Sequence, residues 1–292
     1  MTVVYFSSIL KVKSYHATLS ILQKELTDCS IDYKFLSNTH DIWCRDYMPV
    51  QIGINQFVQF SLSRDYYQEK DEYLRTDLVP ICRELGITPI IPQYNGKPIY
   101  LEGGNVIRGY SKAIICDKVF ADNHIPKTKL LDILTEVLKV ERIIIIPQEP
   151  DEYTGHADGM IRILNSGTVL ANDYLKIGVD KRFRDKFYGS LTGAGLDILL
   201  VPYFPVDSHA YNQPAIGCYI NYLQVGQKIF LPTFNDEPKD HEAINRFGEI
   251  FGTENVIPVT CSEIAQLGGC LNCLSWEINE HPPFKEPLIN TT

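Results

Sequence analysis

The chain lacks any apolar run long enough to cross a membrane. No stretch of its 292 residues reaches the roughly 18 consecutive apolar residues of a transmembrane helix. The N-terminal residues MTVVYFSSILKVKSYHATL also lack a basic segment followed by a long apolar one and a small-residue cleavage site, so we predict no signal peptide. We therefore expect a soluble, cytoplasmic protein with no membrane partner.

Positive charge is scarce as well. The chain has 27 Lys and Arg against 36 Asp and Glu, which gives a formal net charge of -9. Nucleic-acid binding depends on clustered Lys and Arg side chains, and no such cluster is present, so we expect no nucleic-acid partner. An acidic cleft would instead suit a small cationic molecule.

Cysteine is present but dispersed. The eight cysteines (Cys29, Cys44, Cys82, Cys116, Cys218, Cys261, Cys270 and Cys273) are spread along the chain, which speaks against a disulfide framework. Cys270 and Cys273 form a CxxC pair, a pattern typical of redox dithiols and of zinc sites. A zinc site would need a second pair of ligands, and a redox CxxC normally lies near an N-terminal strand. Both alternatives are weak here, but they stay open.

No linker or change of composition divides the chain, so we predict a single domain over residues 1–292. Apolar residues at helical spacing predict helices at 14–26, 69–85, 127–140, 179–191 and 239–251. Strands are expected at 3–6, 31–36, 57–62, 88–91, 113–116, 142–146, 168–171, 197–202, 216–225 and 228–232. This interleaving predicts an α/β fold, and five helices in the chain suggest a repeat of roughly 58 residues.

Four segments carry glycines and polar groups that packing does not require: DIWCRDYMP, IYLEGGNVI, YTGHADGMIRI and LGGCLNCLSW. In the last, Gly268 and Gly269 allow a sharp turn that exposes backbone amides just before Cys273. A thiol in such a position becomes a nucleophile when a neighbouring group lowers its pKa. A buried, inert thiol in a turn is the competing interpretation.

The third segment contains His156 and Asp158, two residues apart. In a strand, both side chains would point to the same face. The histidine could then protonate a leaving amine and later activate water, beside a carboxylate that binds a cation. Because Gly155 and Gly159 flank the pair, a surface turn is the alternative.

The other two segments are weaker taken singly. Arg45 and Asp46 follow Trp43, and such a pair is more often a surface salt bridge. Glu102 precedes two glycines and would usually be solvated. Taken together, however, three carboxylates, a histidine and a cysteine are the groups needed to bind a planar cation and attack its central carbon.

The order of these motifs resembles the guanidine-modifying enzymes of the pentein superfamily, and among them the agmatine deiminase and bacterial peptidylarginine deiminase group. The similarity runs from Trp43 to Cys273 and rests on five short motifs: Trp43-x-Arg45-Asp46, Glu102-Gly103-Gly104, Gly155-His156-x-Asp158, Tyr219-x-Asn221, and Gly268-Gly269 leading to Cys273. The resemblance implies a pentein fold, a five-bladed α/β propeller of ββαβ-type repeats with pseudo-fivefold symmetry and an active site in its central channel.

The resemblance also implies roles for individual residues. Asp46 and Asp158 would bind the guanidinium nitrogens, and Cys273 would attack the carbon to form a covalent thiouronium. His156 would be the general acid and base, and Glu102 would orient it or help to hold the substrate. The remaining substrate-binding candidates are Trp43, Asn221, Gly268 and Gly269. Such a reaction needs neither a metal nor an organic cofactor.

The first substrate candidate is agmatine, which would give N-carbamoylputrescine and ammonia, a step of putrescine biosynthesis. Asn272 is a departure, because agmatine deiminases commonly have His immediately before the nucleophile; Tyr47-Met48-Pro49 also differs from their residue-Gly-Pro. Trp43 and Tyr47 would pack either against the methylene chain of the substrate or in the core.

Several alternatives stay open. Arginine deiminase, peptidylarginine deiminase or amidinotransferase activity would keep the same chemistry. An amino-acid substrate would need a cation for its carboxylate, for which the candidates are Arg45, Arg64, Arg162 and Lys176. A non-catalytic pentein, such as the ribosome anti-association factors, is the alternative of another class. The sequence does not decide between a monomer and a homo-oligomer.

Overall fold

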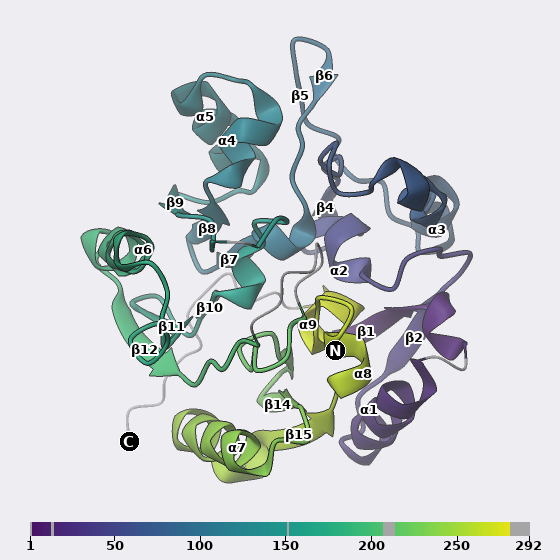
Figure 1. Ribbon diagram of the computed structural model, residues 1–292. Coiled ribbons are helices and arrows are strands. Elements are labelled where there is room, and N and C mark those ends of the chain that lie inside the picture. The colour runs from purple at the N-terminus through teal and green to yellow at the C-terminus, as the bar shows by residue number, and fades with distance from the viewer. Residues whose placement is uncertain (1, 13–14, 151, 207–213, 281–292) are drawn as a thin grey trace, which may run out of the picture.

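The computed structural model describes residues 2–12, 15–150, 152–206 and 214–280, in which one three-stranded unit recurs (Figure 1). In each copy the middle strand pairs antiparallel with the preceding strand and parallel with the following one. Three copies are formed by β7–β9 (Ile107–Gly109, Lys112–Cys116 and Arg142–Ile146), β10–β12 (Ile161–Ile163, Thr168–Asn172 and Asp197–Val201) and β13–β15 (Leu223–Val225, Lys228–Thr233 and Val256–Thr260).

The two ends of the described chain form another unit. β16 (Ser275–Asn279) runs antiparallel to β1 (Thr2–Ser7), which pairs in parallel with β2 (Tyr33–Leu36). A reduced unit contains β3 (Val50–Gly53) and β4 (Gln56–Val58), with a single parallel bridge from Val58 to Ile90. The hairpin of β5 (Gln93–Tyr94) and β6 (Lys97–Pro98) projects from the body of the protein.

Most helices lie at the periphery, and several short ones lie nearer the centre (Figure 1). The peripheral helices are α1 (His16–Asp28), α3 (Leu78–Glu84), α4 (Lys118–Asn123), α5 (Lys127–Val137), α6 (Lys181–Gly193) and α7 (Glu237–Phe251). The short ones that carry the predicted motifs are α2 (Cys44–Tyr47), η4 (Gly103–Asn105), η5 (Ala157–Gly159) and α9 (Leu271–Leu274). Other short helices are η1 (Ser8–Lys11), η3 (Glu69–Leu74), η6 (Thr253–Asn255) and α8 (Ser262–Ala265).

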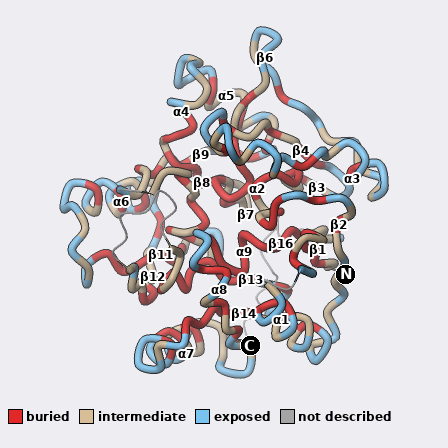
Figure 2. The backbone as a smooth tube through the Cα atoms, turned by 45° about the vertical axis from the view of Figure 1, so that its right-hand side comes forward, coloured by how far each residue is buried: buried red, intermediate tan, exposed pale blue. Residues whose placement is uncertain are grey.

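Each long helix buries one stripe of side chains against its sheet, as an amphipathic helix does. In α5 the buried residues are Leu130 and Leu134, and in α7 they include Ala243 and Phe247, each pair one turn apart. Figure 2 shows the buried residues along the strands and the exposed ones on the outer surfaces of the helices. Within the described ranges, no helix is both long and apolar enough to span a bilayer.

The predicted α/β class is confirmed, and seven predicted strands coincide with β1, β2, β8, β9, β11, β12 and β14. The expected strand at 88–91 is wrong, because Pro89 and Pro92 lack N–H donors and only Ile90 bridges to a neighbour. The strand at 216–225 is confined to Leu223–Val225, and that at 57–62 ends at Val58. The domain count and the five-bladed arrangement about an axis stay predictions.

Most of the predicted helices are present, but the one at 69–85 is divided. Its first part is η3 and its second is α3, whose start is capped by the Asp77 side chain accepting from the Val79 N–H. The intervening residues leave the helical path. Residues before this break, from Tyr66 to Leu74, line the site described next.

Candidate active site

Cys273 lies in α9, where Asn221 holds the backbone on either side of it. The Asn221 side-chain oxygen accepts hydrogen bonds from the N–H groups of Cys270 (3.2 Å) and Cys273 (3.3 Å). The Asn221 carbonyl accepts a third from Asn272 N–H (3.0 Å). Asn221 is itself buried in the loop before β13. The predicted Tyr-x-Asn motif therefore supports the segment that carries the cysteine.

The glycines before Cys273 make room for Trp43. A Cβ atom added to Gly269 would lie 2.6 Å from the Trp43 ring and 3.1 Å from Cys273 Cβ. Gly268 has a φ of +103°, a conformation that favours glycine. Trp43 lines the same pocket as Cys273, whereas Tyr47 is only 1% exposed and lies in the core. Of the two aromatic candidates, the structure brings Trp43 to the pocket.

Asp46 reaches the pocket from α2. One carboxylate oxygen accepts from Gly104 N–H (3.1 Å) and the other from the Tyr66 hydroxyl (2.8 Å). A Cβ atom on Gly104 would lie 2.5 Å from Asp46 Oδ1 and 2.7 Å from His156 Nδ1, which explains why the LEGG motif needs glycine here. Burial is the main influence on Asp46 and raises its pKa to about 7.

His156 and Asp158 do not lie in a strand, so the predicted reason for their proximity is wrong. His156 precedes η5, and Asp158 lies within it. The Glu152 carboxylate shapes the turn by accepting from the N–H groups of Gly155 (2.7 Å) and His156 (3.3 Å). The two side chains still meet in one pocket, because the tight turn brings them to the same side.

His156 lies between two carboxyl groups. Its Nδ1 is 3.5 Å from Asp46 Oδ1, and its Nε2 is 4.0 Å from Glu102 Oε2. Burial is the largest single influence and opposes protonation, but the surrounding carboxylates, Asp46 and Glu102 foremost, outweigh it and raise the pKa of His156. Glu102 itself is 1% exposed and accepts from Ser63 N–H, so it contacts His156 from behind rather than lining the pocket.

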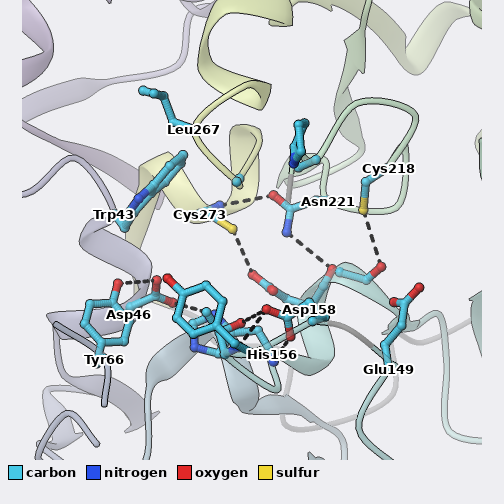
Figure 3. Close-up of a pocket in the computed structure, with 18 of the residues that line it drawn as sticks. Trp43, Asp46, Tyr66, Glu149, His156, Asp158, Cys218, Asn221, Leu267 and Cys273 are labelled. Carbon is cyan, nitrogen blue, oxygen red and sulfur yellow. Dashed lines mark hydrogen bonds and ion pairs between the residues drawn. The ribbon is translucent and has the colours of Figure 1, made fainter. Parts of the chain in front are cut away.

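Asp158 is the carboxylate nearest the cysteine. Its Oδ2 accepts from Asn272 Nδ2 (2.6 Å) and lies 3.5 Å from Cys273 Sγ. Figure 3 shows the sulfur directed toward Asp158, with Asp46 and His156 alongside. Burial, reinforced by Asp158 and Asp46, raises the pKa of the Cys273 thiol well above its ordinary value. These surroundings therefore favour the neutral thiol over the thiolate.

These groups open into a cavity of about 270 Å³. The structure brings eight of the nine predicted site residues to its wall, all except Glu102: Trp43, Asp46, His156, Asp158, Asn221, Gly268, Gly269 and Cys273. The other acidic residues in the wall are Asp41, Asp71, Glu149 and Glu152. Among the described lining residues there is no Lys or Arg, so the cavity is suited to a cation.

None of the cations considered for a substrate carboxylate lines this cavity. Arg45 is paired with Glu277, and Lys176 with Glu242. Arg162 donates to Asn272, and Arg64 lies over the Tyr100 ring. A carboxylate on the substrate would therefore meet acidic groups in the described part of the wall.

Cys270, the other half of the CxxC pair, is fully buried and directs its Sγ toward the Ala215 carbonyl (3.5 Å). It does not line the cavity. All eight cysteines lie in described parts of the chain and are free thiols. The two cysteines of the pair thus have different surroundings, and only Cys273 faces the acidic groups.

Tyr66, Glu149 and Asn272 are polar residues in or beside the pocket that were not among the predicted site residues. Tyr66 bonds Asp46, and Glu149 accepts from the hydroxyls of Tyr174 (2.8 Å) and Tyr203 (2.9 Å). Neither belongs to a glycine-flanked motif, so the sequence gives no signal for them. Asn272 is adjacent to Cys273, and that adjacency could have identified it. Burial raises the pKa of Glu149 to about 7.

Comparison with known proteins places this chain in a family. The profile of the Porphyromonas-type peptidyl-arginine deiminase family matches residues 8–278. An agmatine deiminase of Pseudomonas aeruginosa is 24% identical over 82% of this chain and 74% of its own length. One from Pseudomonas fluorescens is 25% identical over 63% of this chain, but over only 58% of its own length.

Solved structures are similar over nearly the whole chain. The agmatine deiminase of C. jejuni has a TM-score of 0.68 at 14% identity, covering 94% of this chain and 92% of that one. That of Enterococcus faecalis gives 0.68 at 16% identity, with the same coverage. DDAH from Pseudomonas aeruginosa gives 0.57 at 14% identity, covering 95% and 98%. These similarities confirm the predicted pentein fold, and the match of the family profile to residues 8–278 shows that the chain belongs to the Porphyromonas-type peptidyl-arginine deiminase family.

Proposed function

We propose that the protein is a cysteine-dependent deiminase that hydrolyses the guanidinium group of agmatine to N-carbamoylputrescine and ammonia. One observation carries the proposal: Cys273, His156 and two carboxylates, Asp46 and Asp158, face one cavity with no described Lys or Arg in its wall. A guanidinium is a planar, permanently charged fork of N–H donors that pairs with carboxylates. Its carbon reacts only when the cation is held in place and met by a strong nucleophile.

In the proposed reaction the bound cation also prepares the nucleophile. Asp46 and Asp158 hold the guanidinium, and its positive charge offsets the carboxylates that raise the pKa of the Cys273 thiol. The thiol releases its proton to solvent, and the resulting thiolate adds to the guanidinium carbon. His156, whose raised pKa favours the protonated ring, gives a proton to the departing nitrogen, which leaves as ammonia.

The second half of the reaction releases the enzyme. The remaining thiouronium is an alkyl amidine bonded to Cys273 Sγ. His156, now neutral, takes a proton from a water molecule that adds to the same carbon. The C–S bond then breaks, and the new hydroxyl group loses its remaining proton to the departing sulfur, which regenerates the Cys273 thiol and leaves a ureido product. In this scheme Glu102 keeps His156 oriented from its buried side.

The charge of the wall supports agmatine over free arginine. Agmatine carries an ammonium group at the end remote from its guanidinium, and Glu149 offers a half-buried carboxylate in the same cavity. The carboxylate of arginine would instead meet acidic residues. Because like charges placed together cost several kcal/mol, we expect kcat/KM for agmatine to exceed that for arginine by at least about 100-fold.

The proposal is tested by measuring ammonia release and ureido product from agmatine, free arginine, a peptidyl arginine and butylguanidine. We expect turnover of agmatine that is lost in Cys273→Ser and kept in the matched variant Cys270→Ser. Turnover of only one of the other three compounds would contradict the assignment of agmatine as the substrate. Turnover that survives Cys273→Ser would contradict the assignment of Cys273 as the nucleophile. A folded protein that acts on none of the four would overturn the proposed function.

A further inference from the structure

We propose that Asn272 and Arg162 form a positioning pair that sets the Asp158 carboxylate beside the nucleophile, an inference that rests on the proposed function. Asn272 is 3% exposed and lies between the other two residues. Its Nδ2 donates to Asp158 Oδ2 over 2.6 Å, and its Oδ1 accepts from Arg162 Nη1 over 2.7 Å. Neither Asn272 nor Arg162 lines the substrate cavity, so both act through Asp158.

Arg162 determines which way the Asn272 amide faces. An amide has a donor end and an acceptor end, and a half turn about its bond exchanges them. Because a guanidinium can only donate, Arg162 holds the amide oxygen and so directs the NH2 group to Asp158. Arg162 is held in turn over the Tyr222 ring, at 4.6 Å from its centroid. Arg162 therefore orients the Asn272 amide, and the amide in turn donates to the Asp158 carboxylate.

Asp158 lies at the partition between two cavities, which explains the need for an anchor. It lines the substrate cavity with Cys273, and it also lines a second cavity with Arg162 and Asn272. The oxygen that Asn272 holds, Oδ2, is the one 3.5 Å from Cys273 Sγ. Without the amide donor, no described group on the side of the second cavity donates a hydrogen bond to that oxygen. The carboxylate can then turn away from both the thiol and a bound guanidinium.

The direct test is Asn272→Leu, which keeps approximate size but removes the donor. We expect kcat/KM for agmatine to fall about 10- to 100-fold, the effect of losing one hydrogen bond to a charged group. KM should rise, because Asp158 would hold the guanidinium less well. A purely structural role would instead lower the titre of active enzyme and leave KM unchanged. Asn272→His, which restores a ring N–H donor, should recover part of the loss.

Arg162 supplies a second and independent variant. Arg162→Met keeps an apolar stem on Tyr222 but cannot hold the amide, so kcat/KM should fall in the same direction; Arg162→Lys, which can still donate, should retain most of it. Because Arg162 acts through Asn272, the double variant Arg162→Met with Asn272→Leu should be no worse than Asn272→Leu alone. Additive losses would overturn the proposed chain of contacts.

A readout without turnover separates this inference from the proposed function. Chloroacetamidine carries a planar, cationic amidinium group, and chloroacetamide is its neutral counterpart. Both alkylate a thiol, with displacement of chloride. We expect Cys273 of the wild type to react faster with the amidine, and Asn272→Leu to reduce that preference about tenfold. If the wild type turned over agmatine but Asn272→Leu changed neither the turnover nor the preference for the amidine, the positioning pair would be overturned and the proposed function would stand. An Asn272-dependent preference without turnover of any guanidine would overturn the proposed function and support the pair.

Discussion

At the residue scale, Gly104 is the position where one added carbon would meet both Asp46 and His156. The Cβ of an alanine would lie within 2.7 Å of an atom of each, closer than van der Waals contact allows, and neither partner is the free end of a flexible chain. We expect Gly104→Ala to displace the two side chains and to lower kcat at least about 100-fold, because small misplacements in an active site have effects of that size. Steady-state kinetics on agmatine would measure it.

Gly189 in α6 provides the matched control. Nothing lies within 4 Å of a Cβ atom there, and alanine is the better helix former. Gly189→Ala should therefore leave kcat unchanged and stabilise the protein by up to about 1 kcal/mol. If Gly104→Ala behaved like this control, the close approach of η4 to Asp46 and His156 would have no role in the reaction.

Glu149 gives the site a pH dependence that depends on the substrate. Its pKa is raised to about 7, so it loses its charge as the pH falls through 7 and should then bind the ammonium end of agmatine less well. Butylguanidine has no ammonium group. We expect the ratio of kcat/KM for agmatine to that for butylguanidine to fall about tenfold between pH 8 and pH 6.

The ratio removes the contribution of Asp46, whose pKa is also about 7, because in the proposed reaction Asp46 binds the guanidinium of both substrates. In Glu149→Gln the ratio should be low and independent of pH. A ratio that keeps its pH dependence in that variant would show that another group recognises the ammonium end.

The sequence could identify the residues that the proposed chemistry requires, but it could not identify those that hold them in place. Cys273, His156 and Asp158 stand in short glycine-flanked motifs, and all three face the cavity. Tyr66 and Glu149 reach it only through folding of segments with no such pattern. The sequence also suggested a strand for His156 and Asp158, but the Glu152 carboxylate stabilises a turn by accepting from three successive backbone N–H groups, those of Thr154, Gly155 and His156.

At the scale of elements, α9 depends on Asn221. The Asn221 side-chain oxygen is the acceptor for two buried N–H groups, those of Cys270 and Cys273. Asn221→Ala should lower the free energy of unfolding by about 2 kcal/mol or more, because it leaves both without that acceptor, and kcat should fall with it. Urea unfolding and initial rates would measure the two effects.

Asn221→Asp separates the two effects. The carboxylate keeps an oxygen for both N–H groups, so stability should be largely retained. Its negative charge near Cys273 should still slow catalysis, because it opposes formation of the thiolate. Equal stability losses in the two variants would contradict the role assigned to the Asn221 oxygen.

Elements with a clear period were predictable, and those governed by single residues were not. The apolar spacing within 127–140 and 239–251 identified α5 and α7. β15 was missed because Pro258 interrupts its pattern, yet β15 pairs with β14 over five residues. The four-residue helices α2 and α9 are too short for any period to show, although they carry Asp46 and Cys273.

At the scale of the whole molecule, a largely buried ion pair joins the first motif to β16, the strand that follows the last motif. Arg45 Nη2 lies 2.7 Å from both oxygens of Glu277, and the two side chains are 19% and 13% exposed. Arg45→Met would leave Glu277 in a poorly solvated position without this partner and should lower the free energy of unfolding by about 3 kcal/mol.

Adding Glu277→Leu to Arg45→Met should restore much of the lost stability, because a buried pair replaced as a whole costs little. Thermal or urea unfolding of the single and double variants measures this. If the double variant were as unstable as Arg45→Met, Arg45 would stabilise the contact between β16 and α2 through the packing of its side chain rather than through its charge.

The most direct test of the account is the mass of Cys273 in enzyme mixed with agmatine and quenched in acid during turnover. Covalent catalysis by Cys273 predicts an adduct on this residue with the mass of agmatine less ammonia, absent in Cys273→Ser. An adduct that retains only the unsubstituted amidino group would mean that the amine leaves first, as in amidino transfer. Two results together would contradict covalent catalysis by this cysteine: turnover with no adduct on Cys273 under conditions that trap the intermediate, and full activity of Cys273→Ser.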